Sequence, residues 1–332
     1  MKFSRKKRYL PILILIVITV ITISIVIIRV NNQQNQQTLE FREIEFTKGR
    51  GYEFKKGEPN RLIIVLEGGG FSSVMPYRMS GNRFFELFLY SSAIYDRYTI
   101  FIPEKFNREA GWDYIANMEE RENYTIDNLI INYYEVITEY LSMNNFETII
   151  IAGYSEGAAI LPVLYLYFDN PNIKYLISYA GGGLSYYERT QISLAKLYAD
   201  EYPFSLLYEN SRNGWRGIYE NVINYWKTEP FPDSTRNVTG VVDRQVTFKY
   251  LNSLIHLKPI QYYEDIFIPV LFLHGEWDMR VDVDSTRYVE ANLPQKPFSY
   301  IYYPEQLHFP RRETEADEIH RDIAAWLLKV DP

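Results

Sequence analysis

One serine of the chain has the surroundings that nucleophilic chemistry requires. Ser155 is the middle residue of the segment G-Y-S-E-G, residues 153–157, and it follows the apolar run 147–152. At such a strand-to-helix turn the backbone is strained, the neighbours must be small, and the hydroxyl is exposed at the edge of the sheet. A hydroxyl placed there attacks a carbonyl carbon when a base accepts its proton. The segment therefore predicts covalent catalysis by Ser155; the alternative is an ordinary glycine-flanked turn.

Only four histidines are available to supply the base. His308 lies just beyond the apolar run 298–303, on a loop before the last helical stretch of the chain. His320 falls inside that stretch, where a surface or boundary position is expected. His256 ends a helical stretch and is a weaker candidate, and His274 ends an apolar run, where a structural hydrogen bond is expected. We therefore predict His308 as the base.

The base needs a carboxylate that fixes its orientation. Asp278 stands in the segment H-G-E-W-D, on the loop that follows the apolar run 269–273, and we predict that it orients His308. Three other carboxylates on the same loop stay open as alternatives, namely Glu276, Asp282 and Asp284.

Two turns offer backbone N–H groups to an oxygen that develops negative charge. Three consecutive glycines, residues 68–70, follow the apolar run 61–66, and Glu156 directly follows the nucleophile. We predict that the N–H groups of Gly69, Gly70 and Glu156 hold the oxyanion. For the glycines the alternative is a plain turn at the end of a strand.

Short apolar runs and helical stretches alternate along the chain. Runs typical of strands are 39–46, 51–55, 61–66, 98–102, 147–152, 175–180, 269–273 and 298–303. Helical spacing is found at 125–143, at 158–168 and in a last helix that Thr314 is expected to cap. This alternation predicts an α/β fold whose mostly parallel sheet is flanked by helices.

About eighty residues, 184–265, interrupt the alternation between two strands. They contain aromatic helical stretches near 190–226 and 244–257, joined by a turn at 229–240 that is rich in Pro, Asp, Ser and Thr. Aromatic and aliphatic residues are too frequent for a disordered insertion. The segment therefore predicts a helical cap.

The N-terminal thirty residues predict a membrane anchor. Residues 1–9 carry five basic residues and no acid, and residues 10–28 are nineteen uncharged, mostly aliphatic residues, enough for a helix to span a bilayer. A cleaved signal peptide is the alternative, but no small-residue cleavage pattern follows the run. We predict a basic cytoplasmic tail at 1–9, a transmembrane anchor at 10–28, a polar tether at 29–38 and an extracytoplasmic domain at 39–332.

The composition excludes several classes of cofactor and partner. The chain has no cysteine, which excludes a disulfide framework, a thiol nucleophile and a Cys-ligated metal. Six of the 35 basic residues lie in the first thirty positions, so the remainder carries 29 basic against 42 acidic residues. This acidic balance argues against nucleic acid as a partner. The expected partners are a small-molecule or peptide acyl substrate and, through the N-terminal helix, the membrane; no obligate protein partner is indicated.

The region from about 40 to 330 resembles the α/β-hydrolase superfamily. The resemblance is carried by V-L-E-G-G-G at 65–70, G-Y-S-E-G at 153–157, P-V-L-F-L-H-G-E-W-D at 269–278 and the H-F pair at 308–309. The chain departs from the family pattern at Glu67, where many members have His, and at Leu307, where many have Gly.

The resemblance implies an α/β-hydrolase fold with a capped active site, and it matches the family's chain order of Ser155, Asp278 and His308. It implies an acyl-enzyme mechanism with no cofactor and no metal. Because the fold does not fix the substrate, three functions stay open. The first is hydrolysis of a carboxylic ester on an uncharged, largely apolar substrate.

The second function is that of a capped serine aminopeptidase, in which carboxylates of the cap bind the substrate amine. Glu188, Asp200, Glu201 and Glu209 are available for that role, although acidic residues in a cap are more often a solvated face. The third is a surface protein that uses the fold for binding alone, and the complete set of catalytic residue types speaks against it.

Overall fold

The computed structural model describes residues 40–57, 59–69, 84, 86–89, 92–105, 124–202, 209–227, 248–310 and 312–332. The predicted tail, anchor and tether, residues 1–38, all lie outside these ranges, so that part of the prediction stays a prediction. Among the residues described, no helix is both long and apolar enough to cross a bilayer. The residues from Phe41 to Pro332 form one structural unit.

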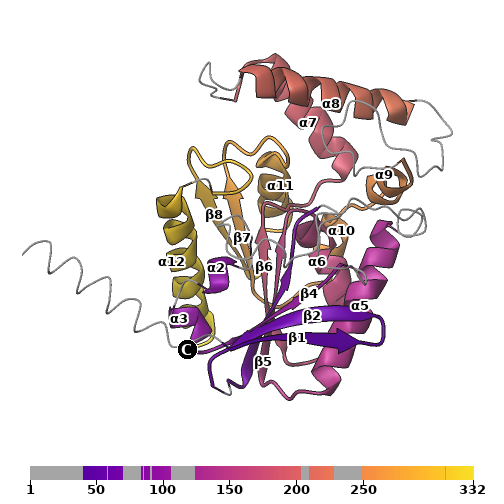
Figure 1. The fold of residues 1–332 in the computed structure, drawn as a ribbon. Coiled ribbons are helices and arrows are strands. Elements are labelled where there is room, and N and C mark those ends of the chain that lie inside the picture. The colour runs from indigo at the N-terminus through magenta and orange to yellow at the C-terminus, as the bar shows by residue number, and fades with distance from the viewer. Residues whose placement is uncertain are drawn as a thin grey trace, which may run out of the picture. The chain divides into compact units, whose positions relative to one another are not determined.

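Eight strands form a single sheet in the order β1-β2-β4-β3-β5-β6-β7-β8 (Figure 1). β2 is antiparallel to β4, and every neighbouring pair from β4 to β8 in this order is parallel. The predicted α/β class with a mostly parallel sheet is confirmed. The strands are β1 (Glu40–Phe46), β2 (Gly49–Lys55), β3 (Arg61–Leu66), β4 (Thr99–Pro103), β5 (Thr148–Tyr154), β6 (Ile173–Tyr179), β7 (Val270–Gly275) and β8 (Phe298–Tyr303).

The register of the parallel strands brings the loops with polar residues to one edge of the sheet. Leu66, the last residue of β3, lies opposite Gly153 of β5, and Tyr179, the last residue of β6, lies opposite Leu273 of β7. Because parallel strands all end at the same edge, the loops after β3, β5, β7 and β8 emerge side by side. Each of these loops carries a residue of the predicted site.

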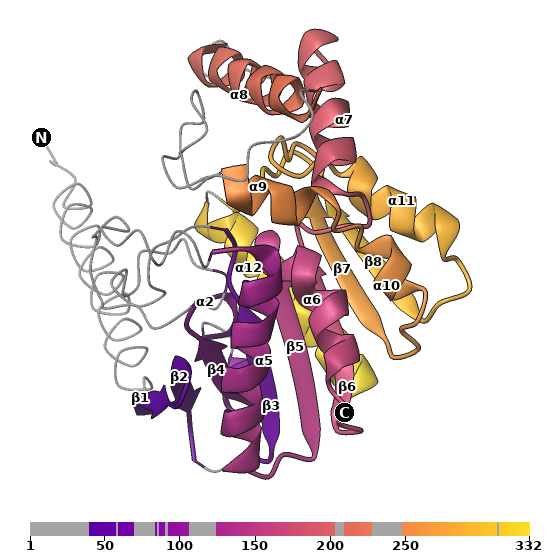
Figure 2. The ribbon, with the colours of Figure 1, turned by 90° about the vertical axis from the view of Figure 1, so that its right-hand side faces the viewer.

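Helices cover both faces of the sheet, which explains why β3 and β5 are almost wholly buried aliphatic residues. α5 (Ile126–Ser142) and α6 (Glu156–Tyr167) lie on one face, with α10 (Ile260–Tyr263) in contact with α6. α12 (Glu313–Val330) and the short helices α2 (Glu86–Leu89) and α3 (Ser92–Tyr95) lie on the other face (Figures 1 and 2). α11 (Asp284–Asn292) follows the loop after β7.

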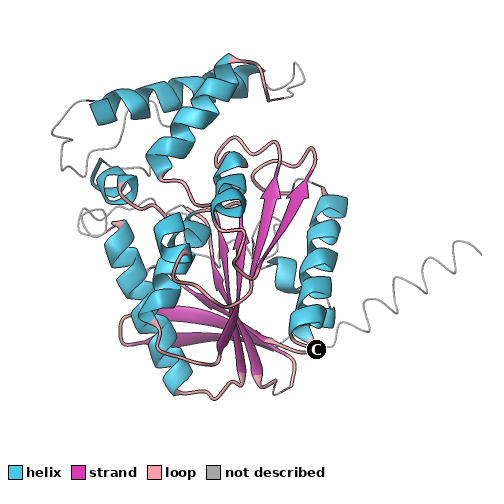
Figure 3. Ribbon diagram, turned by 180° about the vertical axis from the view of Figure 1, so that it is seen from behind, coloured by secondary structure: helices cyan, strands magenta, loops and turns pink. Residues whose placement is uncertain are grey.

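Three of the described helices in the segment predicted as a cap have eight or more residues. They are α7 (Tyr186–Tyr198), α8 (Glu209–Lys227) and α9 (Phe248–Ile255), and they are found beyond the carboxyl edge of the sheet, at the top of Figure 1 and again from behind in Figure 3. α7 packs along α8, and α9 contacts α7 and α5. Residues 203–208 and 228–247 of the segment lie outside the described residues.

The start of the last helix corrects one prediction. α12 begins at Glu313 and its N-cap residue is Arg312, so Thr314 lies inside the helix and does not cap it. The first turn is closed instead by Glu315, whose carboxylate accepts the backbone N–H of Arg312 at 3.4 Å. A glutamate in the third helical position can satisfy such a free N–H group, which allows the helix to begin without a Thr cap.

Candidate active site

Ser155 occupies a tight turn between β5 and α6. Its backbone has φ 54° and ψ −108°, a left-handed conformation that residues other than glycine rarely adopt. Two hydrogen bonds of 2.9 Å fix the turn: the Ser155 N–H donates to the Tyr179 carbonyl, and the Ser155 carbonyl accepts the Ala159 N–H. Strand therefore passes into helix at Ser155, as the G-Y-S-E-G motif predicts.

The two glycines of the motif are required by close backbone contacts. A Cβ atom on Gly157 would lie 2.3 Å from the Leu66 carbonyl oxygen, and one on Gly153 would lie 2.5 Å from the Gly157 carbonyl oxygen. Both distances are far below van der Waals contact. The first turn of α6 can therefore approach the end of β3 only because these positions carry no side chain.

The structure brings Ser155, His308 and Asp278 into one hydrogen-bonded relay. His308 Nε2 lies 2.9 Å from Ser155 Oγ, and His308 Nδ1 lies 2.7 Å from Asp278 Oδ2. A carboxylate only accepts hydrogen bonds, so Nδ1 carries the proton of the neutral ring and Nε2 is left to accept the serine proton. The arrangement can transfer a proton from the Ser155 hydroxyl to His308.

Asp278 is fully buried and held on both of its oxygens. Oδ1 accepts the backbone N–H groups of Arg280 at 2.9 Å and Val281 at 3.0 Å, which leaves Oδ2 to His308. Burial alone would raise the pKa of the Asp278 carboxyl, but His308 and His274 outweigh it and hold the pKa well below its usual range. Asp278 therefore stays charged throughout the neutral range.

His274 has a second contact with this carboxylate that the sequence does not reveal. The ring is fully buried; its Nε2 lies 2.8 Å from the Val281 carbonyl and 3.3 Å from Asp278 Oδ2, and its Nδ1 lies 2.7 Å from Thr286 Oγ1. Because a carbonyl only accepts, Nε2 carries a proton, which it also presents to Asp278. The structural hydrogen bond expected for His274 is present, and it extends to the acid of the relay.

His308 is chemically suited to act as a base. Burial lowers the pKa of its imidazole, Asp278 raises it, and the positive charge of Arg280 together with His274 lowers it further, so that the net pKa is below the usual value. The ring is therefore neutral at neutral pH, the form that accepts a proton.

The alternative acids on the loop after β7 have other partners. Glu276 binds Arg287 at 2.7 Å, and Asp284 binds Lys196 at 2.6 Å. Asp282 is fully buried, like Asp278, but it binds Lys196 at 2.8 Å. Of the other histidines, His256 is exposed just after the end of α9. His320 is buried within α12, so the surface or boundary position expected for it is wrong.

Two of the three predicted oxyanion residues, Glu156 and Gly69, lie within the described residues. Glu156 is the first residue of α6, so its backbone N–H belongs to the free N-terminal turn of that helix. Gly69 follows β3, and a Cβ atom built on it would lie 3.6 Å from Glu156 Oε2. Gly70 lies outside the described residues. The structure thus brings Gly69 to Glu156, and the oxyanion role itself belongs to the proposal below.

A buried ion pair that no sequence motif predicts lies next to Ser155. Lys105 Nζ lies 2.9 Å from Glu156 Oε1, both side chains are buried, and Lys105 also donates to the Gly68 carbonyl. The hydroxyls of Tyr124 and Tyr250 donate to the same carboxylate, the first at 3.0 Å. Burial opposes ionisation of Glu156, but the charge of Lys105 and the hydrogen bonds from Lys105, Tyr250 and Tyr124 together outweigh it and lower the pKa of the carboxyl.

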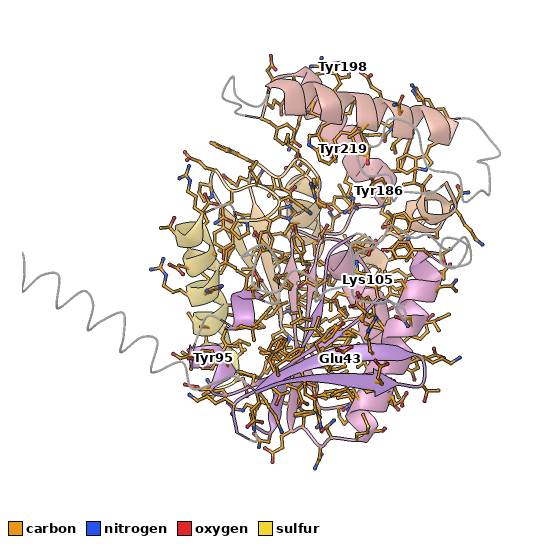
Figure 4. All side chains as sticks on the ribbon, in the orientation of Figure 1. Glu43, Tyr95, Lys105, Tyr186, Tyr198 and Tyr219 are labelled. Carbon is orange, nitrogen blue, oxygen red and sulfur yellow. The ribbon has the colours of Figure 1, made fainter. Side chains whose placement is uncertain are left out.

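This network connects the loop after β3, the nucleophile turn and the cap, because Gly68, Glu156 and Tyr250 lie on those three segments. Lys105 follows β4 and lies near the centre of Figure 4. The only sequence signal for it is a lysine placed directly after an apolar strand, in the segment I-P-E-K.

The cap carboxylates considered for amine binding are engaged elsewhere or exposed. Glu188 accepts from Lys258 at 2.7 Å and closes the first turn of α7 by accepting the Ser185 N–H at 2.9 Å. Asp200 and Glu201 are exposed beyond the end of α7. Glu209 begins α8, and its side chain lies outside the described residues.

Comparison with known proteins agrees with this fold. No family model matches the chain. A protein of Bacillus subtilis (strain 168) with the name "Uncharacterized peptidase YtmA" is 27% identical over 116 residues, which are 34% of this chain and 43% of that protein. The match thus spans less than half of the length of that relative.

Similar solved structures cover nearly the whole described unit. Est1E from Butyrivibrio proteoclasticus has a TM-score of 0.55 at 13% identity and covers 87% of this chain and 98% of its own. The esterase Pf2001 of Pyrococcus furiosus has a TM-score of 0.54 at 14% identity, with coverages of 89% and 92%. The acylaminoacyl peptidase of Pyrococcus horikoshii has a TM-score of 0.53 at 17% identity, with coverages of 90% and 43%. The chain has the α/β-hydrolase fold.

Proposed function

We propose that the protein is a serine hydrolase that cleaves a carboxylic ester through an acyl-enzyme. The observation that carries the proposal is the relay, in which His308 lies 2.9 Å from Ser155 Oγ and 2.7 Å from Asp278. Its place at the carboxyl edge of the sheet, on a strained turn, is where this fold exposes a nucleophile. The fold similarity to the esterase Pf2001 of Pyrococcus furiosus supports the same class.

In the first half of the reaction, Ser155 Oγ attacks the carbonyl carbon of the substrate while its proton passes to His308 Nε2. Asp278 stabilises the imidazolium that forms. The tetrahedral intermediate collapses when His308 returns the proton to the leaving alcohol, which leaves an acyl group on Ser155. Water then attacks the acyl-enzyme, with His308 again accepting and returning a proton.

The oxygen of the tetrahedral intermediate needs hydrogen-bond donors. We assign this role to the backbone N–H groups of Glu156 and Gly69, with Gly70 as the further predicted donor. A single donor of this kind contributes about 3 kcal/mol to the transition state. The ion pair of Lys105 with Glu156 would hold the two donating segments together, because Lys105 also binds the Gly68 carbonyl.

A peptidase with the same relay is the second candidate. Its support is the curated relative that has the name of a peptidase and the fold similarity to an acylaminoacyl peptidase. The chemistry differs only in the leaving group, an amine in place of an alcohol. The aminopeptidase variant has less support, because Glu188 is bound to Lys258 and is not free to hold a substrate amine.

We also propose that the hydrolase domain is held outside the cytoplasmic membrane by the apolar run 10–28. The support is the length of the run and the basic residues that precede it. Protease added to intact cells should then remove the domain, whereas protection until the membrane is permeabilised would contradict this topology.

The test of the function is labelling of the purified protein with a fluorophosphonate, followed by kinetics on aryl esters and aminoacyl amides. We expect labelling and ester hydrolysis in the wild type and neither in Ser155→Ala. Ser142→Ala, an exposed serine on α5, is the matched control and should behave as the wild type. Ester hydrolysis that persists in Ser155→Ala above the background of water would exclude Ser155 as nucleophile. Faster cleavage of amides than of esters would favour the peptidase.

A further inference from the structure

Two arginines lie where the cap meets the loop that carries Asp278, and neither has a carboxylate partner among the residues the structure describes. Arg189 of α7 is only 7% exposed, and its Nε atom is buried without a hydrogen-bond partner. Arg280 is exposed; its backbone N–H binds Asp278, but its guanidinium forms no ion pair within the described ranges. A buried guanidinium without an opposite charge is unfavourable, so Arg189 needs an explanation.

Each of the two guanidinium groups lies over an aromatic ring of the cap. Arg189 Cζ is 4.7 Å from the centre of the Tyr186 ring, and Arg280 Cζ is 5.3 Å from the centre of the Trp215 ring. Such stacking orients the flat guanidinium but uses none of its N–H groups. The donors of both arginines therefore stay available for an acceptor that comes from outside the described chain.

The arginines are close to the relay because α8 docks on the residue after Asp278. Tyr219 of α8 donates its hydroxyl to the Met279 carbonyl, and the Trp215 ring packs on Tyr219 at 5.6 Å. Figure 4 shows Tyr219 beneath α8 and Tyr186 at the lower end of α7. Arg280, which follows Met279, thus lies between the relay and the cap.

The positive charges of Arg189 and Arg280 act on the same side chains. Burial raises the pKa of Tyr186 and of Tyr219, and the charges of Arg189 and Arg280 act against burial at both hydroxyls. Arg280 also lowers the pKa of His308, which burial lowers first. Two cations from different segments therefore act on the same two tyrosines, and one of them, Arg280, also acts on His308.

We propose that Arg189 and Arg280 form a subsite for a carboxylate of the substrate, so that the acyl compound cleaved at Ser155 is an anion. The inference rests on the proposed serine hydrolase function and names its substrate class. A guanidinium matches a carboxylate with two parallel, charge-assisted hydrogen bonds. The residues after position 30 carry 29 basic against 42 acidic residues, so an anionic substrate needs local positive charge of this kind.

The test compares two pairs of esters, and the two members of each pair differ by one carboxylate group. In one pair the charge is on the acyl group: 4-nitrophenyl butyrate against mono-4-nitrophenyl glutarate. In the other it is on the leaving group: phenyl acetate against 4-acetoxybenzoate. The two pairs distinguish on which side of the scissile bond the carboxylate lies. The measured quantity is the ratio of kcat/KM for the anionic ester to that for its neutral partner.

We expect Arg189→Gln and Arg280→Gln each to lower this ratio about tenfold to a hundredfold in at least one pair, the effect of losing a charge-assisted hydrogen bond. At a pH above the acid limb, where His308 is neutral in the wild type and in the variants, kcat/KM for the neutral esters should change far less than this ratio. Arg216→Gln is the control, because Arg216 also lies in the cap and stacks on a ring, that of Tyr198, at 4.8 Å. It should leave both ratios as in the wild type.

The subsite proposal is wrong if the ratio is the same in the wild type and in both variants while neutral esters are still cleaved. That result would not affect the proposed hydrolase function. If Arg189→Gln also loses the neutral ester, its fold has suffered, and the exposed Arg280 decides by itself. Failure of the proposed function has a different result: the wild type cleaves no ester of either pair and is not labelled by fluorophosphonate.

Discussion

Asp278 and Asp282 lie four residues apart on the loop after β7, and both are fully buried. Their partners nevertheless differ. Asp278 is hydrogen-bonded to His308 at 2.7 Å and contacts His274 at 3.3 Å. Asp282 is bound by Lys196 of α7 at 2.8 Å and by the hydroxyl of Tyr202, just after that helix.

The comparison teaches that the partner, and not burial, decides what a buried carboxylate can do. Histidine exchanges its proton near neutral pH, so Asp278 is coupled to a group that can change its charge during a reaction. Burial lowers the pKa of Lys196, but Asp282 and Asp284 outweigh it and raise the pKa, so this lysine stays charged. Asp282 therefore connects the end of a cap helix to the loop that carries the acid.

The largest expected effect on activity comes from a substitution of Asp278, the acid of the relay. Asp278→Asn removes the charge that stabilises the imidazolium and allows His308 to adopt the wrong tautomer. We expect kcat on aryl esters to fall by about 10³–10⁴ while circular dichroism shows a folded protein. A loss smaller than that of Asp282→Asn would mean that the acid of the relay is misassigned.

The second prediction tests the other carboxylate. Asp282→Asn removes the buried negative charge that pairs with the ammonium group of Lys196. We expect the free energy of unfolding to fall by about 3 kcal/mol. The melting temperature should fall by roughly 5–10 °C, with ester turnover reduced far less than in Asp278→Asn. Asp284→Asn is the control, because this more exposed partner of the same lysine should cost about 1 kcal/mol or less.

The third prediction concerns the second histidine on Asp278. His274→Phe removes the N–H that faces the carboxylate, and we expect kcat/KM to fall about tenfold, the effect of one charge-assisted hydrogen bond. His274→Gln keeps a donor near the position of Nε2 and should restore part of the loss. Equal activity in the two variants would show that the ring only fills space.

The smallest expected effect is a shift in the pH profile of kcat/KM. The neutral form of His308 is the base, so kcat/KM should rise with pH through the pKa of this ring, which lies below the ordinary value for histidine. Arg280 contributes to that lowering. Arg280→Gln should therefore raise the pKa and move the acid limb to higher pH, so that the variant loses relatively more activity at low pH on a neutral ester. A limb that stays in place or moves the other way would contradict this sign.

The fold and the relay can be predicted from the sequence because each depends on local signals. The eight apolar runs became strands because β-branched and aliphatic residues between turn signals specify them. Ser155, Asp278 and His308 are recognisable because each lies on the loop or turn after such a run, and parallel strands bring those positions to one edge. The helix start at Arg312 was displaced from Thr314 by two residues, because Glu315 closes the first turn.

The remaining polar contacts could not be predicted because their partners are far apart in the chain. Lys105 and Glu156 are separated by 51 positions, and neither belongs to a motif that demands the other. Arg189 has a ring partner nearby in the sequence, Tyr186, but no sequence pattern indicates its place in the fold. That place depends on the contact between Tyr219 and Met279, which are 60 positions apart. Such pairings follow from the way the cap is placed on the sheet, which no local pattern specifies.

The left-handed backbone of Ser155 has an evolutionary consequence. A residue with a side chain costs about 1–3 kcal/mol in this conformation, whereas glycine adopts it almost freely. Ser155→Gly should therefore give a protein that is inactive yet harder to unfold. At this position the substitution that abolishes activity also increases the free energy of unfolding. Without selection for the reaction, the stable and inactive variant would therefore be retained easily.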